Sequence, residues 1–178
     1  MSSVLGSQLA VMVGDLLESV SGSLDDLSDD ELHALPLEFS TSIGFNAWHV
    51  MRSADNVVHF AFYREQPVWA QQDLAEAWSL PRNEQGTGMP LADVQALRFP
   101  SAAELATYGR DVSKVVVARI EAMDDEFLLG TTATRVDGEL AERQRAQTVG
   151  RVMISHANQH YGFIQLLRQM LGKDEPGI

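Results

Sequence analysis

The chain reads Ile154-Ser155-His156-Ala157-Asn158-Gln159-His160-Tyr161, with two histidines four residues apart inside a longer apolar periodicity. On an α-helix, side chains four residues apart lie on one face, one turn apart. Two imidazoles so placed can bind one divalent ion when a third ligand comes from another element. His49, far upstream, is the best candidate for that third ligand. The segment 142–172 is therefore predicted to be a long helix that carries two ligands of a metal site.

Three further segments show the three-and-four apolar spacing of long amphipathic helices. They cover residues 4–20, residues 41 or 42 to 65, and residues 101–123. Shorter helices are predicted at 28–34, 68–80 and 91–97, with a linker at 82–90. Ser28 with Glu31, and Ser101 with Glu104, have the spacing of capping boxes. Residues 127–142 are irregular and indicate either an extended arm or a small hairpin.

Four long amphipathic helices predict an all-α fold, a four-helix bundle with short additional helices. Such bundles commonly hold metal sites in their core, built from side chains on facing helices. The length of 178 residues suits one domain, which we assign to residues 1–172, followed by a polar C-terminal tail at 173–178. The acidic residues after the first helix are interpreted as a solvated face that matches a helix dipole, in preference to a calcium loop.

Charge and composition exclude several classes of partner. The formal net charge is −12 and the sequence pI is about 4.7, which argues against nucleic acid and against anionic membrane surfaces. The chain has no cysteine, so a metal would be bound by His, Asp or Glu, and any thiolate would come from a cosubstrate. The start of the chain lacks the basic and apolar parts of a secretory signal. A cytoplasmic location is expected.

The spacing of His156 and His160 leaves two interpretations open. The pair either binds a metal together with His49, or forms a polar core in which each ring bonds to protein groups. A metal would satisfy both rings at once in a region of low dielectric. Residue 157 is alanine, so this is not the zinc-protease pattern, in which a Glu beside the first His acts as the base.

Other residues are candidates for supporting such a site. Asn56 lies seven residues after His49 and is predicted to face the same cavity, and Asp55 is a second group able to orient ligating histidines. A helix-surface charge is the simpler interpretation of Asp55. His59 is predicted to face elsewhere and His33 to be solvated. The tryptophans at positions 48, 69 and 78 are interpreted as core or pocket wall, with stacking on a substrate as the alternative. The arginines at positions 143, 145 and 151 are interpreted as solvated helix charges, with attraction of an anionic cosubstrate to a pocket mouth as the alternative.

Three stretches together resemble the DinB-like (DinB/YfiT) family of metalloenzymes. Residues 41–56, with Trp48-His49 at their centre, resemble the second-helix signature of that family. Residues 86–89 resemble the turn that follows in one branch, and residues 154–160 resemble the His-x-x-x-His signature of the fourth helix. The three occur in the family's order, and the likeness covers residues 41–171. One departure is Ala54, where many relatives have an acidic residue.

The resemblance implies a bundle with up-down-down-up order and a long crossover between the second and third long helices. It implies a divalent metal, zinc or nickel, bound by His49, His156 and His160, and a homodimer. Members with known activity are thiol-dependent transferases or isomerases. Our first hypothesis is a metal-dependent enzyme that transfers a low-molecular-weight thiol to a small electrophile, or hydrolyses a substrate. The alternative is a non-enzymatic dimeric bundle that binds a small ligand or partner, with the metal structural or absent.

Overall fold

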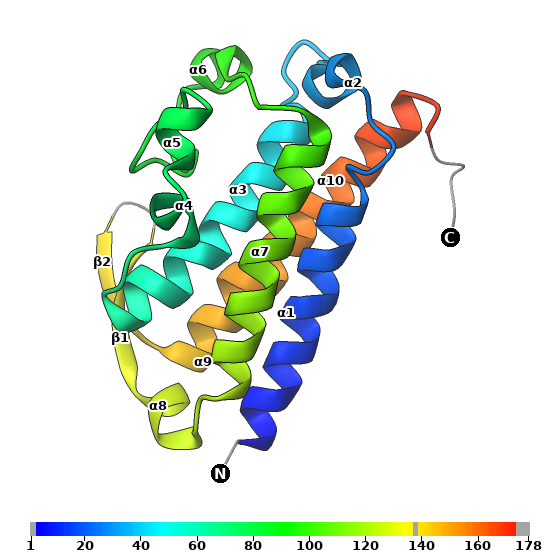
Figure 1. The fold of residues 1–178 in the computed structure, drawn as a ribbon. Coiled ribbons are helices and arrows are strands. Elements are labelled where there is room, and N and C mark those ends of the chain that lie inside the picture. Colours follow the sequence, from blue (N-terminus) through cyan, green and yellow to red (C-terminus); the bar gives the residue numbers. More distant parts are fainter. Residues whose placement is uncertain (1–2, 137–138, 174–178) are drawn as a thin grey trace.

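The long segments are helical and pack side by side as a bundle (Figure 1). The computed structural model describes residues 3–136 and 139–173. The four long segments are α1 (Val4–Gly22), α3 (Ile43–Asp55) continued by η1 (Asn56–Phe62), α7 (Ala102–Glu121), and the run α9 (Arg145–Thr148), η2 (Val149–His156) and α10 (Ala157–Met170). The predicted all-α class is confirmed.

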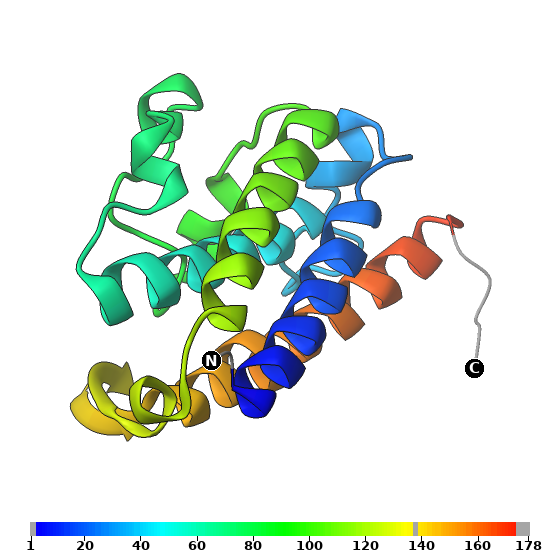
Figure 2. The ribbon, with the colours of Figure 1, turned by 60° about the horizontal axis from the view of Figure 1, so that its bottom comes forward.

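The arrangement brings α3 between two neighbours. It packs against α7 on one side and α10 on the other, while α1 packs against α7 and α10. Figure 1 shows α1 running upward from the N-terminus, α3 and α7 both running back down, and α10 running up again. The two parallel helices, α3 and α7, are joined by a crossover, the segment 63–101, which Figures 1 and 2 both place on the flank away from α1.

Helix α3 is buried on every side, since all 13 of its residues are buried. Ser42 caps its start by accepting a 3.1 Å hydrogen bond from the Phe45 N–H. A helix that is surrounded by protein has no solvent face for its polar residues. Its Asn, His, Arg and Asp side chains must therefore find partners inside the molecule, and these partners build the site described below.

Sequence signals at helix starts agree with the structure. The capping boxes at Ser28 and Ser101 are both present, and they begin α2 (Asp29–His33) and α7. The β-branched run at 115–117 lies within α7, as the flanking period predicts. Both η1 and η2 follow the wider π-helical hydrogen-bonding pattern, for which the sequence gives no signal.

The crossover contains α4 (Val68–Gln71), α5 (Leu74–Ala77) and α6 (Leu91–Ala96). A single helix over 68–80 was predicted, but the chain breaks at Asp73, whose φ of 51° is left-handed. That conformation ends one helical turn and starts the next in a new direction. The predicted short helix at 91–97 is confirmed by α6.

The irregular region is a hairpin. After α8 (Asp125–Leu129), strands β1 (Thr131–Val136) and β2 (Glu139–Gln144) pair antiparallel, with Thr131 opposite Gln144. The Thr132 hydroxyl donates a 2.9 Å hydrogen bond to the Ala61 carbonyl of η1. Figure 2 shows this yellow segment gathered at one end of the bundle. The fourth long helical run therefore begins at Arg145, three residues later than predicted.

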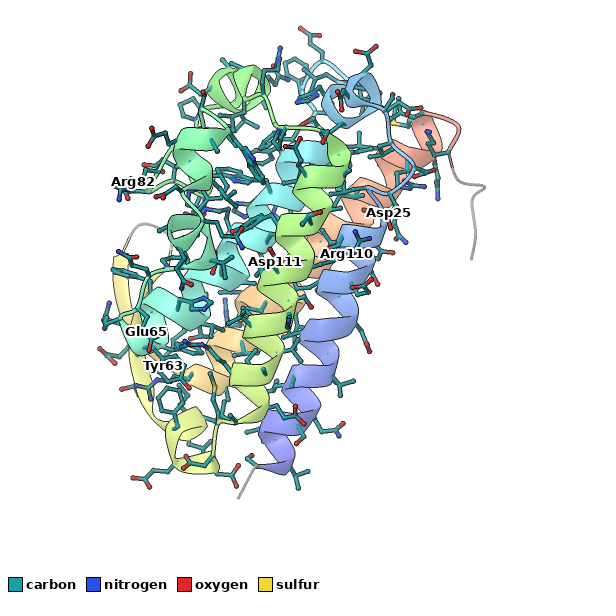
Figure 3. All side chains as sticks on the ribbon, viewed as in Figure 1. Asp25, Tyr63, Glu65, Arg82, Arg110 and Asp111 are labelled. Carbon is teal, nitrogen blue, oxygen red and sulfur yellow. The ribbon has the colours of Figure 1, made fainter. Side chains whose placement is uncertain are left out.

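Two aspartates after α1 form ion pairs with arginine side chains on the bundle helices. Both oxygens of Asp25 lie 2.6 Å from Arg110 of α7 (Figure 3), and Asp26 pairs with Arg168 of α10 at 2.7 Å. Hydrogen bonding to Arg168 lowers the pKa of the Asp26 carboxyl. The face predicted to be only solvated thus ties the α1–α2 connection to two bundle helices.

One helix in the described part of the chain, α1, is long and apolar enough to span a membrane by length and composition alone. Its inward face supplies core residues, among them Val13, Leu17 and Val20, so its hydrophobicity is explained in part by packing against α7 and α10. Of the predicted tail, Lys173 forms a 3.0 Å ion pair with Glu31, and residues 174–178 lie outside the described residues. The single-domain assignment stays a prediction.

Candidate metal centre

Three imidazoles meet between α3 and the η2–α10 run. The ring centroids of His49 and His160 are 4.6 Å apart, those of His156 and His160 are 4.6 Å apart, and those of His49 and His156 are 5.2 Å apart. One nitrogen from each ring lies within 4.8 Å of the other two. The structure therefore brings together the three histidines that were predicted as ligands, although more than a hundred residues of sequence separate His49 from the other two.

The crossover orients His49. Its Nδ1 donates a hydrogen bond to the backbone carbonyl of Gln85, which leaves Nε2 without a proton in the neutral ring. Gly86 makes this approach possible: its φ is +91°, and a Cβ there would lie 2.6 Å from the Phe45 ring and 3.4 Å from His49 Nδ1. The Phe45 ring stacks on His49 at 5.8 Å. The predicted linker thus serves as one wall of the site.

His160 is oriented by α3. Its Nδ1 lies 2.7 Å from Oδ1 of Asn46, and because an amide oxygen only accepts, Nδ1 carries the proton. The Nε2 atom of the ring then has a free lone pair. This pattern, with one ring nitrogen hydrogen-bonded and the other facing a shared centre, is the usual arrangement of histidines that bind metals.

His156 completes the cluster from the end of η2. Its Nε2 lies 3.2 Å from Nε2 of His160. Zinc binds imidazole nitrogens at about 2.0–2.1 Å in a tetrahedron, which separates two ligand atoms by about 3.4 Å. The His156–His160 pair therefore already has the spacing of two zinc ligands. A direct hydrogen bond from His156 to His160 fits the same distance, which is the basis of the non-metal alternative.

The surroundings keep the three rings neutral, the form that a ligand requires. Burial, followed by the charges that His49 and His156 would carry, lowers the pKa of His160 to about 3. Burial also lowers the pKa of His49, with a smaller contribution from His156 and against the Gln85 hydrogen bond. Burial lowers the pKa of His156 as well. The donor set of three neutral imidazoles fits a divalent transition metal.

Asp55 is not a surface charge; that interpretation was wrong. Its carboxylate is fully buried and accepts hydrogen bonds from the N–H groups of Val68 at 2.9 Å and Trp69 at 3.0 Å. It also accepts from the Tyr108 hydroxyl at 2.9 Å and pairs with Nδ1 of His59 at 2.8 Å. Asp55 thus holds the start of α4 and binds α3 to α7, and none of these partners is one of the three clustered histidines.

Asn56 lies beside the crossover wall of the site. Its Nδ2 donates a 2.6 Å hydrogen bond to Oε1 of Gln85, and its Oδ1 accepts from Arg52 at 3.3 Å. Since the Gln85 carbonyl receives the His49 hydrogen bond, Asn56 acts on His49 through Gln85 and makes no hydrogen bond to the imidazole.

The two remaining histidines have other partners. His59 is fully buried against Asp55, away from the cluster, as predicted. His33 was predicted to be solvated; its side chain is only partly exposed, and both of its ring nitrogens have protein partners. Its Nδ1 donates to the Asp29 carbonyl at 2.7 Å and its Nε2 accepts from the Phe99 N–H at 2.9 Å. The His33 ring also stacks on Phe99, so His33 ties α2 to the start of α7.

The tryptophans and arginines are mostly structural. Trp48 and Trp69 are core residues, at 0% and 1% exposed. Arg145 lies 4.2 Å above the Phe127 ring and donates to the Phe127 carbonyl, so it is a packed side chain and not a free surface charge. Arg151 is exposed and Arg143 is partly exposed.

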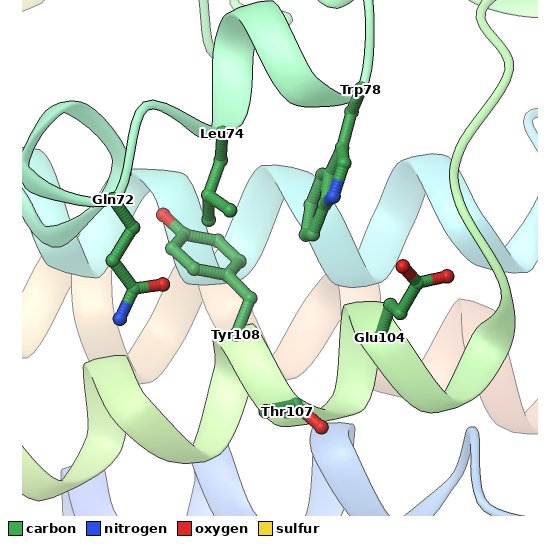
Figure 4. A pocket seen from close by; sticks show the side chains of 6 residues that line it. All are labelled: Gln72, Leu74, Trp78, Glu104, Thr107 and Tyr108. Atoms are coloured by element: carbon green, nitrogen blue, oxygen red, sulfur yellow. The ribbon is translucent and has the colours of Figure 1, made fainter.

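A separate hollow lies between the crossover and α7 (Figure 4). Its volume is about 220 Å³, and it is lined by Gln72, Leu74, Trp78, Glu104, Thr107 and Tyr108. Tyr108 and Trp78 meet edge to face at 5.9 Å. The polar groups at its rim already have protein partners, since Gln72 binds Asp111 and Glu104 binds Ser101. None of the three clustered histidines lines it.

Fold and site together define a helical bundle with a three-histidine cluster that fits a metal-binding protein. The family model described as the DinB superfamily matches residues 15–164. The chain belongs to the DinB superfamily, as its motifs indicate. The structure is similar to the crystal structure of a conserved protein from Enterococcus faecalis, with a TM-score of 0.80 and 16% identity over 98% of this chain and 100% of that one. At that identity the likeness supports the fold alone. No curated protein matches the sequence.

Sequence reasoning missed Asn46 and the Gln85 carbonyl. Asn46 precedes His49 by three residues and therefore shares its helix face, so its position was a usable signal. The Gln85 carbonyl is a backbone group in a linker, and nothing in its side chain indicates that it binds a histidine.

Proposed function

We propose that this protein is a divalent-metal-dependent enzyme with His49, His156 and His160 as the ligands. The observation that carries the proposal is the convergence of three neutral imidazoles, two of which are oriented by protein groups behind them. Three protein ligands leave a fourth position open, which is typical of catalytic sites and not of closed structural ones. Zinc and nickel are the metals proposed, since both suit imidazole ligands.

The reaction proposed is transfer of a low-molecular-weight thiol to a small electrophile, with hydrolysis as the second possibility. A divalent ion at this site would supply a Lewis acid that favours the deprotonated form of a thiol or water near neutral pH. The chain contributes no cysteine, so the nucleophilic sulfur belongs to the cosubstrate. The chain's own role is to hold three uncharged rings in place and to exclude water on the α3 side, where His49 is only 4% exposed.

Measurement of the metal content tests the proposed three-histidine site. Protein purified without a polyhistidine tag is analysed by elemental mass spectrometry beside a His49→Ala/His156→Ala variant. About one zinc or nickel ion per chain in the wild type, lost in the variant, supports the site. No metal after reconstitution with either ion overturns it, and the His156–His160 hydrogen bond then explains the cluster.

A thiol screen tests the reaction. The metal-loaded protein is incubated with glutathione, mycothiol or bacillithiol and a panel of small electrophiles, and product is measured by mass spectrometry. Activity that needs both the metal and His156 supports the enzyme. If chelation lowers the melting temperature strongly while His156→Ala leaves every measured activity intact, the metal is structural and the non-enzymatic bundle is the better description.

We also propose that the protein is a cytoplasmic homodimer. The outward face of α1 carries apolar residues seven apart, with Val4 81%, Val11 57% and Met12 54% exposed. Exposed apolar stripes of this kind are typical of interfaces. Sedimentation equilibrium of wild type, Val11→Glu/Met12→Glu and the control Phe60→Glu, whose phenyl ring is 57% exposed on η1, is the test. A dimer that only the α1 variant disrupts supports the proposal, and a monomeric wild type overturns it.

A further inference from the structure

The side-chain amide of Asn46 has a single possible orientation. Its Nδ2 donates to the Thr41 hydroxyl oxygen at 2.7 Å and to the Ser42 carbonyl at 2.7 Å, which uses both of its hydrogens. Asn46 is 2% exposed, so water does not offer alternatives. Its Oδ1 therefore has to face His160, where it lies 2.7 Å from Nδ1.

We propose that Asn46 is the positioning residue of the site, which sets the tautomer of His160 so that Nε2 presents its lone pair to the other two imidazoles. The Thr41 hydroxyl and the Ser42 carbonyl, at the start of α3, accept hydrogen bonds from the amide Nδ2 and so fix the orientation of the amide. The amide oxygen accepts the hydrogen bond from Nδ1 of His160, which fixes the orientation of the ring. The part of this inference that concerns metal affinity rests on the proposed function, and the part that concerns the tautomer does not.

The three rings differ in how firmly they are held. His49 has the Gln85 carbonyl behind it and His160 has Asn46. Within residues 3–136 and 139–173, no hydrogen bond to Nδ1 of His156 is seen, and His156 is partly exposed. The orientations of the His49 and His160 rings are therefore fixed in the metal-free protein, and His156 is the ring that can rotate when a metal binds. Loss of such an orienting partner typically lowers metal affinity by about 10- to 100-fold.

The test compares Asn46→Leu and Asn46→Asp with the control Asn158→Leu. Leucine has the same branched arrangement of four side-chain heavy atoms as asparagine but cannot accept a hydrogen bond, whereas aspartate keeps the acceptor. Asn158 lies on α10 near His160, but its amide bonds to the Ile154 carbonyl at 2.8 Å and it is exposed. Two quantities are measured: the zinc dissociation constant, by competition with a chromophoric chelator, and the tautomer of His160 in metal-free protein, by ¹⁵N chemical shifts of its ring. Melting temperatures of the metal-free proteins show whether each variant folds.

The expected result is a dissociation constant about 10- to 100-fold higher for Asn46→Leu, with the Nδ1–H tautomer of His160 no longer dominant. Asn158→Leu should keep both the wild-type tautomer and the wild-type affinity. Asn46→Asp should keep the tautomer, because it keeps the acceptor that faces Nδ1 of His160, although its second oxygen loses the hydrogen bond to the Ser42 carbonyl. A folded Asn46→Leu protein with unchanged affinity and an unchanged tautomer overturns the proposal.

The wild-type protein alone supplies a test that needs no variant to fold. In the metal-free state, His160 should carry its proton on Nδ1, and an Nε2–H ring there overturns the inference. If the wild type binds neither zinc nor nickel, the proposed function fails, and the tautomer measurement still decides the role of Asn46.

Discussion

The hydroxyl of Tyr108 on α7 lies 2.9 Å from Oδ2 of Asp55 on α3, and neither side chain is more than 1% exposed. The same carboxylate receives the first two N–H groups of α4. One buried charge thus joins two bundle helices and the crossover. The negative charge also lies at the N-terminus of a short helix, where its sign is favourable.

Asp55→Ala should lower the free energy of unfolding by about 3–5 kcal/mol, because it removes one partner of a buried ionic cluster and leaves the others unpaired. Tyr108→Phe, which removes a single donor, should cost about 1–2 kcal/mol. Urea denaturation followed by circular dichroism measures both. An Asp55→Ala protein as stable as Tyr108→Phe would show that the carboxylate does not hold the crossover.

Alkaline pH should destabilise the protein through Tyr108. Burial, together with the negative charge of Asp55, raises the pKa of Tyr108 well above its ordinary value of 10. The unfolded chain releases this proton near pH 10 while the folded chain retains it, so this stabilisation is complete below pH 10 and is lost as pH rises further. Melting temperature against pH should therefore fall less steeply above pH 10 in Tyr108→Phe. Parallel curves would contradict this.

Gly86→Ala should weaken zinc binding by at least tenfold, because a Cβ there overlaps the Phe45 ring and displaces the carbonyl that orients His49. Gly88→Ala is the matched control. Gly88 also has a positive φ, +74°, but a Cβ there meets nothing within 4 Å. Backbone strain should cost both variants about 1 kcal/mol of stability. Gly86→Ala should lose more stability than this because of the overlap with Phe45, and only Gly86→Ala should lose affinity for zinc. Chelator competition measures affinity, and equal losses would assign the effect to strain alone.

Asn56→Ala should weaken zinc binding by less than tenfold, since it acts on His49 only through Gln85. Gln85→Ala removes the other half of the same hydrogen bond, while its backbone carbonyl remains. The double variant should therefore bind zinc no more weakly than the weaker single variant. Fully additive losses in this cycle would mean that the two side chains act independently.

The sequence predicted those parts of the structure that depend on local pattern. The long helices follow from apolar period, and Ser28 and Ser101 mark helix starts because their capping partners lie only three residues away. The grouping of His49 with His156 and His160 followed from helix spacing and family motifs. These signals need only neighbouring residues or a known motif.

What could not be predicted depends on contacts between distant segments. Asp55 resembles a surface charge because periodicity distinguishes faces only when one face meets solvent, and α3 is buried all round. His33 resembles a solvated residue until α7 starts beside it, so that Phe99 donates to its ring. The break at Asp73 requires a left-handed residue that does not have to be glycine.

The crossover is anchored to α3 at two places, near residues 68–69 by Asp55 and near residue 85 by His49 and Asn56. Between those anchors, the exposed bend at residues 82–83 can therefore change in length or composition without moving the histidines, since doubling a loop costs only about 0.6 kcal/mol in closure entropy. This makes the segment a natural graft point. New binding loops inserted there by evolution or by protein engineering would sit on a scaffold whose site geometry is already secured.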